Sequence, residues 1–189
     1  MNNEKNIKLT FDLEQVANDI LAKCNLISIS IRDEAMEDIR ANVQEPDNPE
    51  TRSIINRAVT EAFGNVKAMC QRYLKTGRTT DNNNLERMVA SVTYTLDGNG
   101  EPTDTIDTIT YETVLLDLYI PNFNVSVTDI LKSDIHKYVV DYTMGRFLQD
   151  QLADKAAEYK GLADGEDGDA IIRHLNARER FNMRKPSWI

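Results

Sequence analysis

The 189-residue sequence predicts an α+β fold that is mainly helical, with a helical bundle and a long β-hairpin inserted before a C-terminal antiparallel pair of helices. Apolar residues recur at three- and four-residue steps in several segments of both halves of the chain, which is the spacing of amphipathic helices. Two β-rich runs, about 88–96 and 106–120, flank the turn-rich segment DGNGEPTD. The stretch 118–151 then changes from an extended segment to a long amphipathic helix.

Length and composition suit a single domain of residues 1–189, because 41% hydrophobic residues are enough for a core of ordinary size. We expect a helical core from 12–76 and 126–182, a β-hairpin at 86–120 and a basic C-terminal tail at 178–189. The longest apolar runs are far shorter than the roughly 20 residues that span a bilayer. The N-terminus is polar where a signal peptide would be apolar, so we expect a soluble, intracellular protein with no membrane partner.

The N-terminal segments are expected to be an extended lead followed by two helices. The lead covers residues 7–11, and apolar residues at helical spacing over 13–24 mark the first helix. The run LISISI at 26–31 is ambiguous, because its β-branched alternation suits a strand while the residues after it are helical in composition. A second helix is placed at about 32–43.

A third helix is expected after the polar break EPDNPE. Asn48 is the predicted N-cap and Pro49 occupies the first turn. Apolar pairs keep helical phase until Gly77, which is expected to end the helix. Such a helix would be roughly 40 Å long, enough to organise the helical core.

The two β-rich runs are expected to pair with each other. The phase of the alternation shifts at 114–118, as a bulge or a stretch buried on both faces would produce. An isolated two-stranded hairpin is marginal in water, so it must pack on the helices or add to the sheet of a neighbour. The alternation that defines its inner face runs through Val92, Tyr94 and Leu96 against Ile109 and Tyr111.

The helix after the hairpin has several start signals. Ser126 is the predicted cap with Asp129 at the third helical position, and Val125 and Ile130 are placed for a hydrophobic staple. One broad apolar face follows, and we expect sister molecules or other assembly partners to cover it. Its residues are Leu131, Ile135, Tyr138, Val139, Tyr142, Phe147, Leu148 and Leu152. A return helix from Asp154, interrupted or frayed near Gly165 and Gly168, completes the antiparallel pair.

Residue types that bind metals or catalyse reactions are not arranged for either task. Cys24 and Cys70 fall on the apolar phase of helices and are expected to be buried free thiols. The acidic segment 164–169 lacks the ligand spacing of a calcium loop and is expected to be a solvated turn. His136 and His174 lie at similar heights in the helix hairpin, but two imidazoles do not complete a metal site. We expect no catalytic residue, cofactor or metal, and hence a non-enzymatic protein.

The formal net charge of -9 makes the whole molecule a poor non-specific binder of nucleic acid. Residues 173–189 contain five bases and one acid, a net of +4, so the rest of the chain carries -13. A basic tail on an acidic body favours contact between neighbouring copies, or contact with DNA through the tail alone. A solvated basic helix end, favoured by the helix dipole, explains the same residues equally well.

The order of segments carries a family resemblance. A short N-terminal helix, a middle helix ending in RYL and a β-hairpin closing on LYIPNFNVSVTDIL precede IHKYVVDYTMGRFLQDQLADKAAEY and a basic RFNMRKP tail. This order, over about two-thirds of the chain, resembles small neck or tail proteins of tailed bacteriophages and prophages, of the head-tail connector or adaptor type. The acidic DGEDGD segment departs from the usual uninterrupted last helix.

The resemblance implies a non-enzymatic virion subunit, copied around a ring, that bridges the portal and head to the tail after assembly in the host cytoplasm. Its partners would be further copies, portal proteins and tail proteins. A ring requires that one face of each copy meets a different face of the next. The expected contact residues are those of the tail, Arg178, Arg180, Arg184, Lys185 and Trp188, and of the hairpin tip, Asp97 and Asn99.

Two other classes of function remain as alternatives. A cytoplasmic adaptor would bind a partner helix in a helical groove and form a one-to-one complex without cyclic symmetry. An enzyme would need a concave pocket that holds carboxylates with perturbed pKa values. The spacing of Asp and Glu along the chain gives no reason to expect such a pocket.

Overall fold

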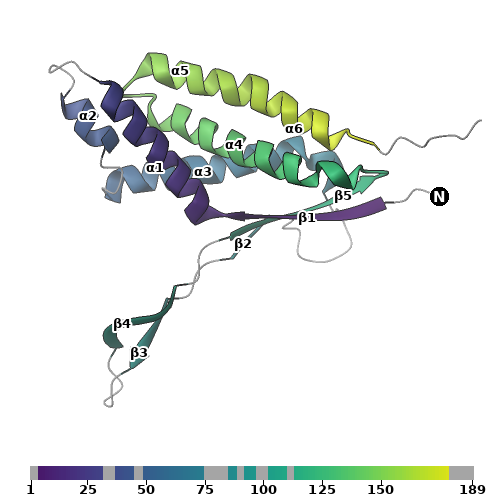
Figure 1. Ribbon diagram of the computed structural model, residues 1–189, viewed down its shortest axis with the longest axis horizontal. Helices are drawn as coiled ribbons and strands as arrows, with labels where there is room; N and C mark the ends of the chain where they lie inside the picture. The colour runs from purple at the N-terminus through teal and green to yellow at the C-terminus, as the bar shows by residue number, and fades with distance from the viewer. Residues whose placement is uncertain are drawn as a thin grey trace, which may run out of the picture.

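The computed structural model describes residues 4–31, 37–44, 49–74, 85–88, 92–96, 102–109 and 113–178. Its strands are β1 (Glu4–Asp12), β2 (Leu85–Met88), β3 (Val92–Leu96), β4 (Pro102–Ile109) and β5 (Thr113–Pro121). Its α-helices are α1 (Leu13–Ser30), α2 (Glu37–Gln44), α3 (Pro49–Met69), α4 (Thr128–Phe147), α5 (Ala153–Gly161) and α6 (Gly168–Leu175). The predicted α+β, mainly helical fold is confirmed, with its hairpin and its C-terminal helices (Figure 1).

Helix α4 is the centre of the molecule and packs against α1, α3, α5 and α6 (Figure 1). Its apolar face is buried within the chain itself: Leu131, Ile135 and Val139 are all inaccessible to solvent. Val140, Thr143 and Met144 are buried as well, so the helix is covered on most sides, as expected of a core helix. The prediction that other molecules cover this face is therefore wrong, because α1, α3 and the α5–α6 arm cover it.

The start of α4 differs from the predicted cap. A 3₁₀ turn, η3 (Val125–Val127), precedes the helix, and the Asn124 side chain accepts a hydrogen bond from the Ser126 backbone amide at 3.2 Å. The N-cap position of α4 is Val127, which makes no capping hydrogen bond through its side chain. With the N-cap at Val127, Val125 and Ile130 do not occupy the two positions of a staple, and they are 54% and 48% exposed. The capping role passes to Asn124 because the chain turns once before the helix begins.

The three-stranded sheet has the order β1–β5–β2 and is antiparallel. Strand β1 pairs with β5 without a break, from Glu4 opposite Pro121 to Asp12 opposite Thr113. Side chains of β5 alternate strictly between buried and half-buried, with Val114, Leu116, Leu118 and Ile120 toward the core. The expected bulge or doubly buried stretch at 114–118 is therefore wrong, because Leu115 takes the other face of the sheet.

Strands β3 and β4 form a separate two-stranded ribbon. Val92 lies opposite Ile109, as predicted, and the register shifts on both sides of Tyr94. Figure 1 shows this β3–β4 ribbon reaching away from the helices and from the three-stranded sheet. Tyr111, the remaining residue of the predicted inner face, lies outside the described residues.

Helix α1 continues through most of the ambiguous LISISI run. Its N-cap is Asp12, which accepts a hydrogen bond from the Glu14 amide at 2.9 Å. Ile27 and Ser28 are buried against the bundle, so helical packing prevails over the β-branched alternation and the strand reading of 26–30 is wrong. Helix α2 confirms the second predicted helix over 37–43, and residues 32–36 lie outside the described part.

Helix α3 ends eight residues before Gly77, where the sequence predicted its end. It is followed by a 3₁₀ turn, η2 (Gln71–Tyr73), and Leu74 is extended and forms a bridge with Leu118 of β5. The helix stops at Met69 because the next residues are recruited to the edge of the sheet. Asn48 and Gly77, the predicted cap and stop, lie outside the described residues.

The return arm after α4 is continuous, contrary to the predicted interruption near Gly165 and Gly168. Helices α5 and α6 are joined by a π-helical segment, η4 (Leu162–Asp167), without an intervening loop. The arm runs antiparallel to α4, as predicted, and is close to it at Gly145. A Cβ atom at Gly145 would lie 3.1 Å from the Lys160 backbone nitrogen.

Candidate functional site

Of the seven predicted contact residues, Arg178 alone lies in the described part of the chain. The other six lie outside it: Arg180, Arg184, Lys185, Trp188, Asp97 and Asn99. Their role in an interface stays a prediction.

Arg178 anchors the beginning of the basic tail to the body. Its guanidinium donates hydrogen bonds to the Leu175 carbonyl at 2.8 Å and to the Tyr73 hydroxyl at 3.0 Å. The same group lies 5.6 Å from the centre of the Tyr73 ring, within cation–π range. Tyr73 in turn donates to Asn176 Oδ1 at 2.9 Å. Arg178 also bridges to Phe123 through the backbone, so the tail leaves the body from a fixed point.

A shallow hollow of about 380 Å³ adjoins this anchor, between the end of α3 and α6. It combines apolar side chains with the exposed polar groups of Gln71, Arg72 and Asn176. Ile172, on its rim, is 47% exposed. Its full lining is Ala68, Met69, Gln71, Arg72, Tyr73, Ile172, Leu175 and Asn176.

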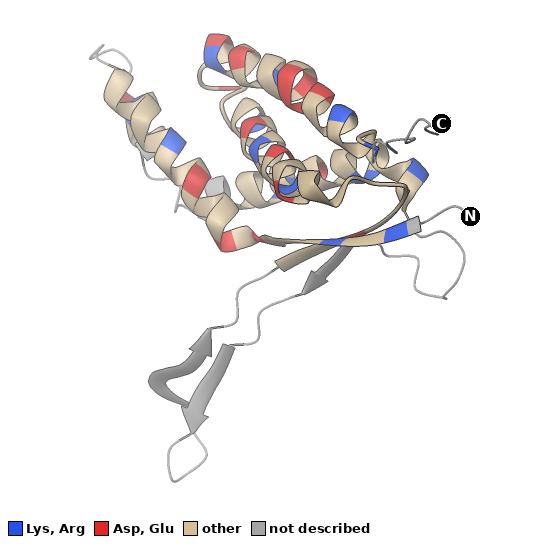
Figure 2. Ribbon diagram, turned by 45° about the vertical axis from the view of Figure 1, so that its right-hand side comes forward, with Lys and Arg blue, Asp and Glu red and all other residues tan. Residues whose placement is uncertain are grey.

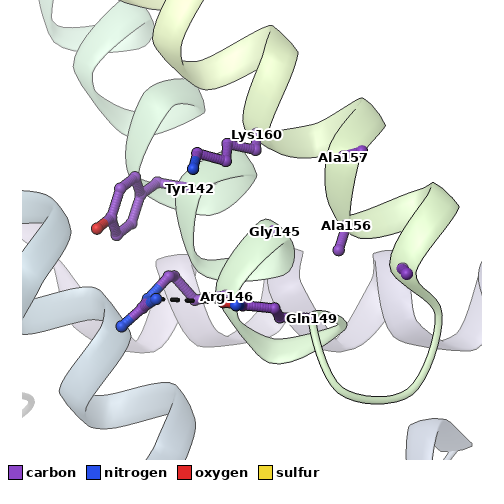
Figure 3. A pocket seen from close by; sticks show the side chains of 8 residues that line it. Tyr142, Gly145, Arg146, Gln149, Ala156, Ala157 and Lys160 are labelled. Atoms are coloured by element: carbon purple, nitrogen blue, oxygen red, sulfur yellow. Dashed lines mark hydrogen bonds between the residues drawn. The ribbon is translucent and has the colours of Figure 1, made fainter.

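A second concavity, of about 310 Å³, is the groove between α4 and α5. Small residues form its floor, and Figure 3 shows the Lys160 side chain extending toward Tyr142. Arg146 donates a hydrogen bond to Gln149 Oε1 at 3.2 Å and pairs with Glu61 at 3.3 Å. The Lys160 ammonium therefore makes the groove basic, whereas the Arg146 guanidinium is paired with the Glu61 carboxylate. Its lining is Tyr142, Gly145, Arg146, Gln149, Ala153, Ala156, Ala157 and Lys160.

Two buried acids and two partly exposed lysines meet between α1, α4 and η4. Asp141 of α4 is 1% exposed and is paired with Lys23 of α1, whose ammonium also lies 5.1 Å from the Tyr159 ring centre. Asp167 of η4 is 2% exposed and is paired with Lys137 at 2.8 Å. The inner cluster of Lys23, Lys137, Asp141 and Asp167 thus joins three elements through two ion pairs.

The inner cluster shifts the pKa of Asp141. Burial raises the pKa of Asp141, the Lys23 ammonium lowers it, and hydrogen bonding with the Asp167 carboxyl raises it again, with a net upward shift. Asp167 Oδ2 is buried and has no hydrogen-bond partner among the described residues. Each acid is neutralised by its own lysine, which is the arrangement of a structural ion-pair network.

Both histidines pair with acids of neighbouring helices. His136 Nε2 lies 2.6 Å from Asp19 Oδ2 of α1, and His174 pairs with Asp134 across α4 and α6. The two imidazoles therefore serve different helix contacts and do not share a ligand. Over the part of the chain that the structure describes, no three His, Cys, Asp or Glu side chains are grouped to hold a metal ion.

The two cysteines are buried and unpaired with each other, as predicted. Burial raises the pKa of the Cys24 thiol to about 11 and that of Cys70 to about 12. Such thiols are protonated at neutral pH and are poor nucleophiles.

The acidic segment 164–169 is only partly the solvated turn that the sequence predicted. Asp164, Glu166 and Asp169 are exposed, whereas Asp167 points into the bundle. The difference arises because the π-helical turn rotates one acid toward Lys137.

Both edge strands of the three-stranded sheet, β1 and the shorter β2, and both strands of the ribbon have one edge without a strand partner among the described residues. The outer edge of β1, on the side away from β5, has no strand partner among the described residues. The β3–β4 ribbon makes its extensive contacts only within itself, as far as the described elements show. Exposed strand edges are the usual sites at which another chain adds.

Sequence reasoning missed the inner cluster and the pairing of β1. One signal was available for the cluster: Asp141 lies in the apolar run YVVDYTMG, where an acid has to be buried with a partner. No sequence signal pointed to Lys23 as that partner, because the pair is 118 residues apart.

No helix among the described segments has the length and apolar character needed to cross a bilayer. The chain matches no protein-family model, no curated protein and no solved structure.

Proposed function

We propose that this chain is a non-enzymatic structural subunit of the neck or tail of a tailed-bacteriophage virion, where copies form a ring that connects the portal and head to the tail. Assembly takes place in the host cytoplasm. The partners are further copies of the chain, portal proteins and tail proteins. Any contact with DNA is made through the basic C-terminal tail.

The observation that carries this proposal is the β3–β4 ribbon, which lies outside a body that covers its own core. A two-stranded ribbon without a packing surface is marginal in water, so a long one is expected where a neighbour completes it. The segment order that resembles neck proteins supports the same class.

The charge distribution also supports contact between copies. Figure 2 shows acidic residues concentrated along the α5–α6 arm. The exposed acids there are Asp154, Glu158, Asp164, Glu166 and Asp169. The tail that follows the same arm is basic, so the two surfaces are complementary between neighbouring copies.

Native mass spectrometry and negative-stain microscopy test the proposal. The full chain, alone and mixed with the portal and tail proteins of the same phage, should form closed rings or join particles. A chain that stays monomeric in every mixture would refute the proposed function.

The α4–α5 groove favours one alternative, a helical adaptor that binds a partner helix with an acidic residue near Lys160. Such a protein would form a one-to-one complex without cyclic symmetry. Ala157 is exposed on the groove wall, so Ala157→Trp should fill the groove without unfolding the protein. Loss of the one-to-one complex in this variant would favour the adaptor, whereas rings that survive the substitution favour the virion subunit.

A further inference from the structure

We infer that the β3–β4 ribbon of one copy adds to the outer edge of β1 in the next copy, so that the sheet continues from protomer to protomer. This inference rests on the proposed function and names the contact by which the ring would close. It is a heterologous contact, since the two surfaces come from different parts of the chain.

The acceptor edge is well suited to strand addition. Strand β1 has nine residues, contains no proline and pairs with β5 without a register shift. Natural sheets protect such an edge with a proline, a bulge, a very short strand or charged side chains, and of these devices β1 has only the charged side chains. Ile7, Leu9 and Phe11 fix the core-facing side of β1, so its register and its edge are held rigid.

The donor is a ribbon of comparable length. Strand β4 has eight residues, and neither β3 nor β4 has a second strand partner in the described sheets. A strand that adds to a sheet edge gains main-chain hydrogen bonds along its whole length. Addition to β1 would turn the marginal ribbon into part of a five-stranded sheet across two copies.

The ribbon of the same copy is badly placed to make this contact. Three residues separate β2 from β3, three separate β4 from β5, and β1 lies on the opposite side of β5 from β2. To reach the outer edge of its own β1, the ribbon would have to fold back across the sheet. Figure 1 shows it pointing away from β1 instead. The acceptor therefore belongs to another copy.

Charge favours pairing of the ribbon with β1 over the symmetric pairing of two ribbons. The segment 88–112 has no Lys or Arg and five acids, which are Asp97, Glu101, Asp104, Asp107 and Glu112. Two ribbons paired with each other would bring ten acids together, and like charges across strands are destabilising. Strand β1 has as many bases as acids and presents Lys8 on its exposed face, so it repels the acidic ribbon far less than a second ribbon would.

Site-specific cross-linking tests the contact. Copies carrying Lys8→Cys are mixed with copies carrying Thr105→Cys and treated with a short bis-maleimide, to which the buried Cys24 and Cys70 are inaccessible. A covalent dimer of the two variants is expected. Lys155→Cys, on the exposed side of α5, is the matched control and should not cross-link to Thr105→Cys.

A ribbon-deleted chain, in which a short Gly-Ser linker replaces residues 92–109, gives the second readout. Its thermal unfolding should match that of the full chain, because the ribbon does not pack on the helices. It should form no rings alone. When it is added to full-length copies, it should end their assembly at short oligomers, because it can accept a ribbon at β1 but has no ribbon to donate.

The outcomes separate the two proposals. Rings formed equally well by the ribbon-deleted chain, or cross-linking no stronger than in the Lys155→Cys control, would overturn the ribbon-to-β1 contact and leave the ring intact. Absence of any assembly by the full chain, with or without portal and tail proteins, would overturn the proposed function itself.

Discussion

Asp141 shows how one residue constrains the bundle. A carboxylate that is 1% exposed loses its hydration and is tolerated only with a paired cation or a bound proton. Lys23 supplies the cation from α1 and, being 31% exposed, keeps part of its own hydration. The pair therefore fixes the position of α1 against α4, although its net contribution to stability relative to apolar residues is small.

Replacing Lys23 with methionine should leave the buried Asp141 carboxylate without its paired cation. We expect the free energy of unfolding at neutral pH to fall by about 3 kcal/mol, as for other buried pairs that lose one partner. The double variant Lys23→Met/Asp141→Leu should recover most of the loss, because the remaining charge is gone. Denaturant unfolding followed by circular dichroism measures both variants, with Lys132→Met at an exposed position of α4 as the control.

The sign of the pH dependence follows from the raised pKa of Asp141. A carboxyl whose pKa is raised by folding contributes stability below its ordinary value of 3.8 and loses that contribution as the pH rises through the folded pKa. Lys23→Met removes an influence that lowers this pKa, so its destabilisation should be small in acid and grow toward neutral pH. A loss of stability that is the same at every pH would contradict this account.

At the scale of elements, the packing of α5 on α4 depends on the absence of one side chain. The backbones meet at Gly145, where a Cβ atom would lie 3.1 Å from the Lys160 nitrogen and 3.4 Å from the Ala156 carbonyl oxygen. Both neighbours are backbone atoms of a helix, so neither can rotate out of the way. The close approach also brings η4 near enough for Asp167 to reach Lys137.

Gly145→Ala should therefore destabilise the protein by about 1–3 kcal/mol, the usual cost of overpacking. Gly64→Ala in α3 is the matched control, since a Cβ there meets nothing within 4 Å. The control should be neutral or stabilising by up to about 1 kcal/mol, because alanine favours a helix more than glycine does. Equal effects of the two substitutions on the thermal midpoint would show that the α4–α5 contact is not tight.

At the scale of the whole molecule, the helical body carries two features that the proposed ring would use. The β3–β4 ribbon extends from one side, and the basic tail begins at Arg178, which is held by Tyr73 and Leu175. Because Arg178 is held in place, the tail has the same starting point in every copy. In the proposed ring, this makes a repeated contact between the tail and the acidic α5–α6 arm of a neighbour possible.

Truncation after Phe181 removes Arg184, Lys185 and Trp188 but keeps the Arg178 anchor. The fold should survive, while ring formation should weaken and lose its dependence on salt, because exposed charge pairs are screened at high ionic strength. Light scattering across a salt series compares the truncated and full chains. Unchanged assembly with unchanged salt dependence would exclude the tail from the interface.

The outcome for individual elements shows where sequence reasoning reached its limit. Helical spacing located α1, α3, α4 and the return arm, and alternation located the hairpin strands. The ends of these elements were less predictable. Helix α3 stops at Met69 because Leu74 pairs with Leu118 of β5, which is 44 residues further along the chain. The cap of α4 was misplaced for a similar reason, since Asn124 closes a turn before the helix.

The sequence by itself determined the class of fold, the burial of both cysteines and the uneven distribution of charge, because these depend on composition and on spacing along the chain. Tertiary structure alone decided what covers α4, which strands pair with β5 and which lysine meets Asp141. Those outcomes depend on contacts between segments far apart in sequence, and local periodicity shows that a face must be covered without showing what covers it.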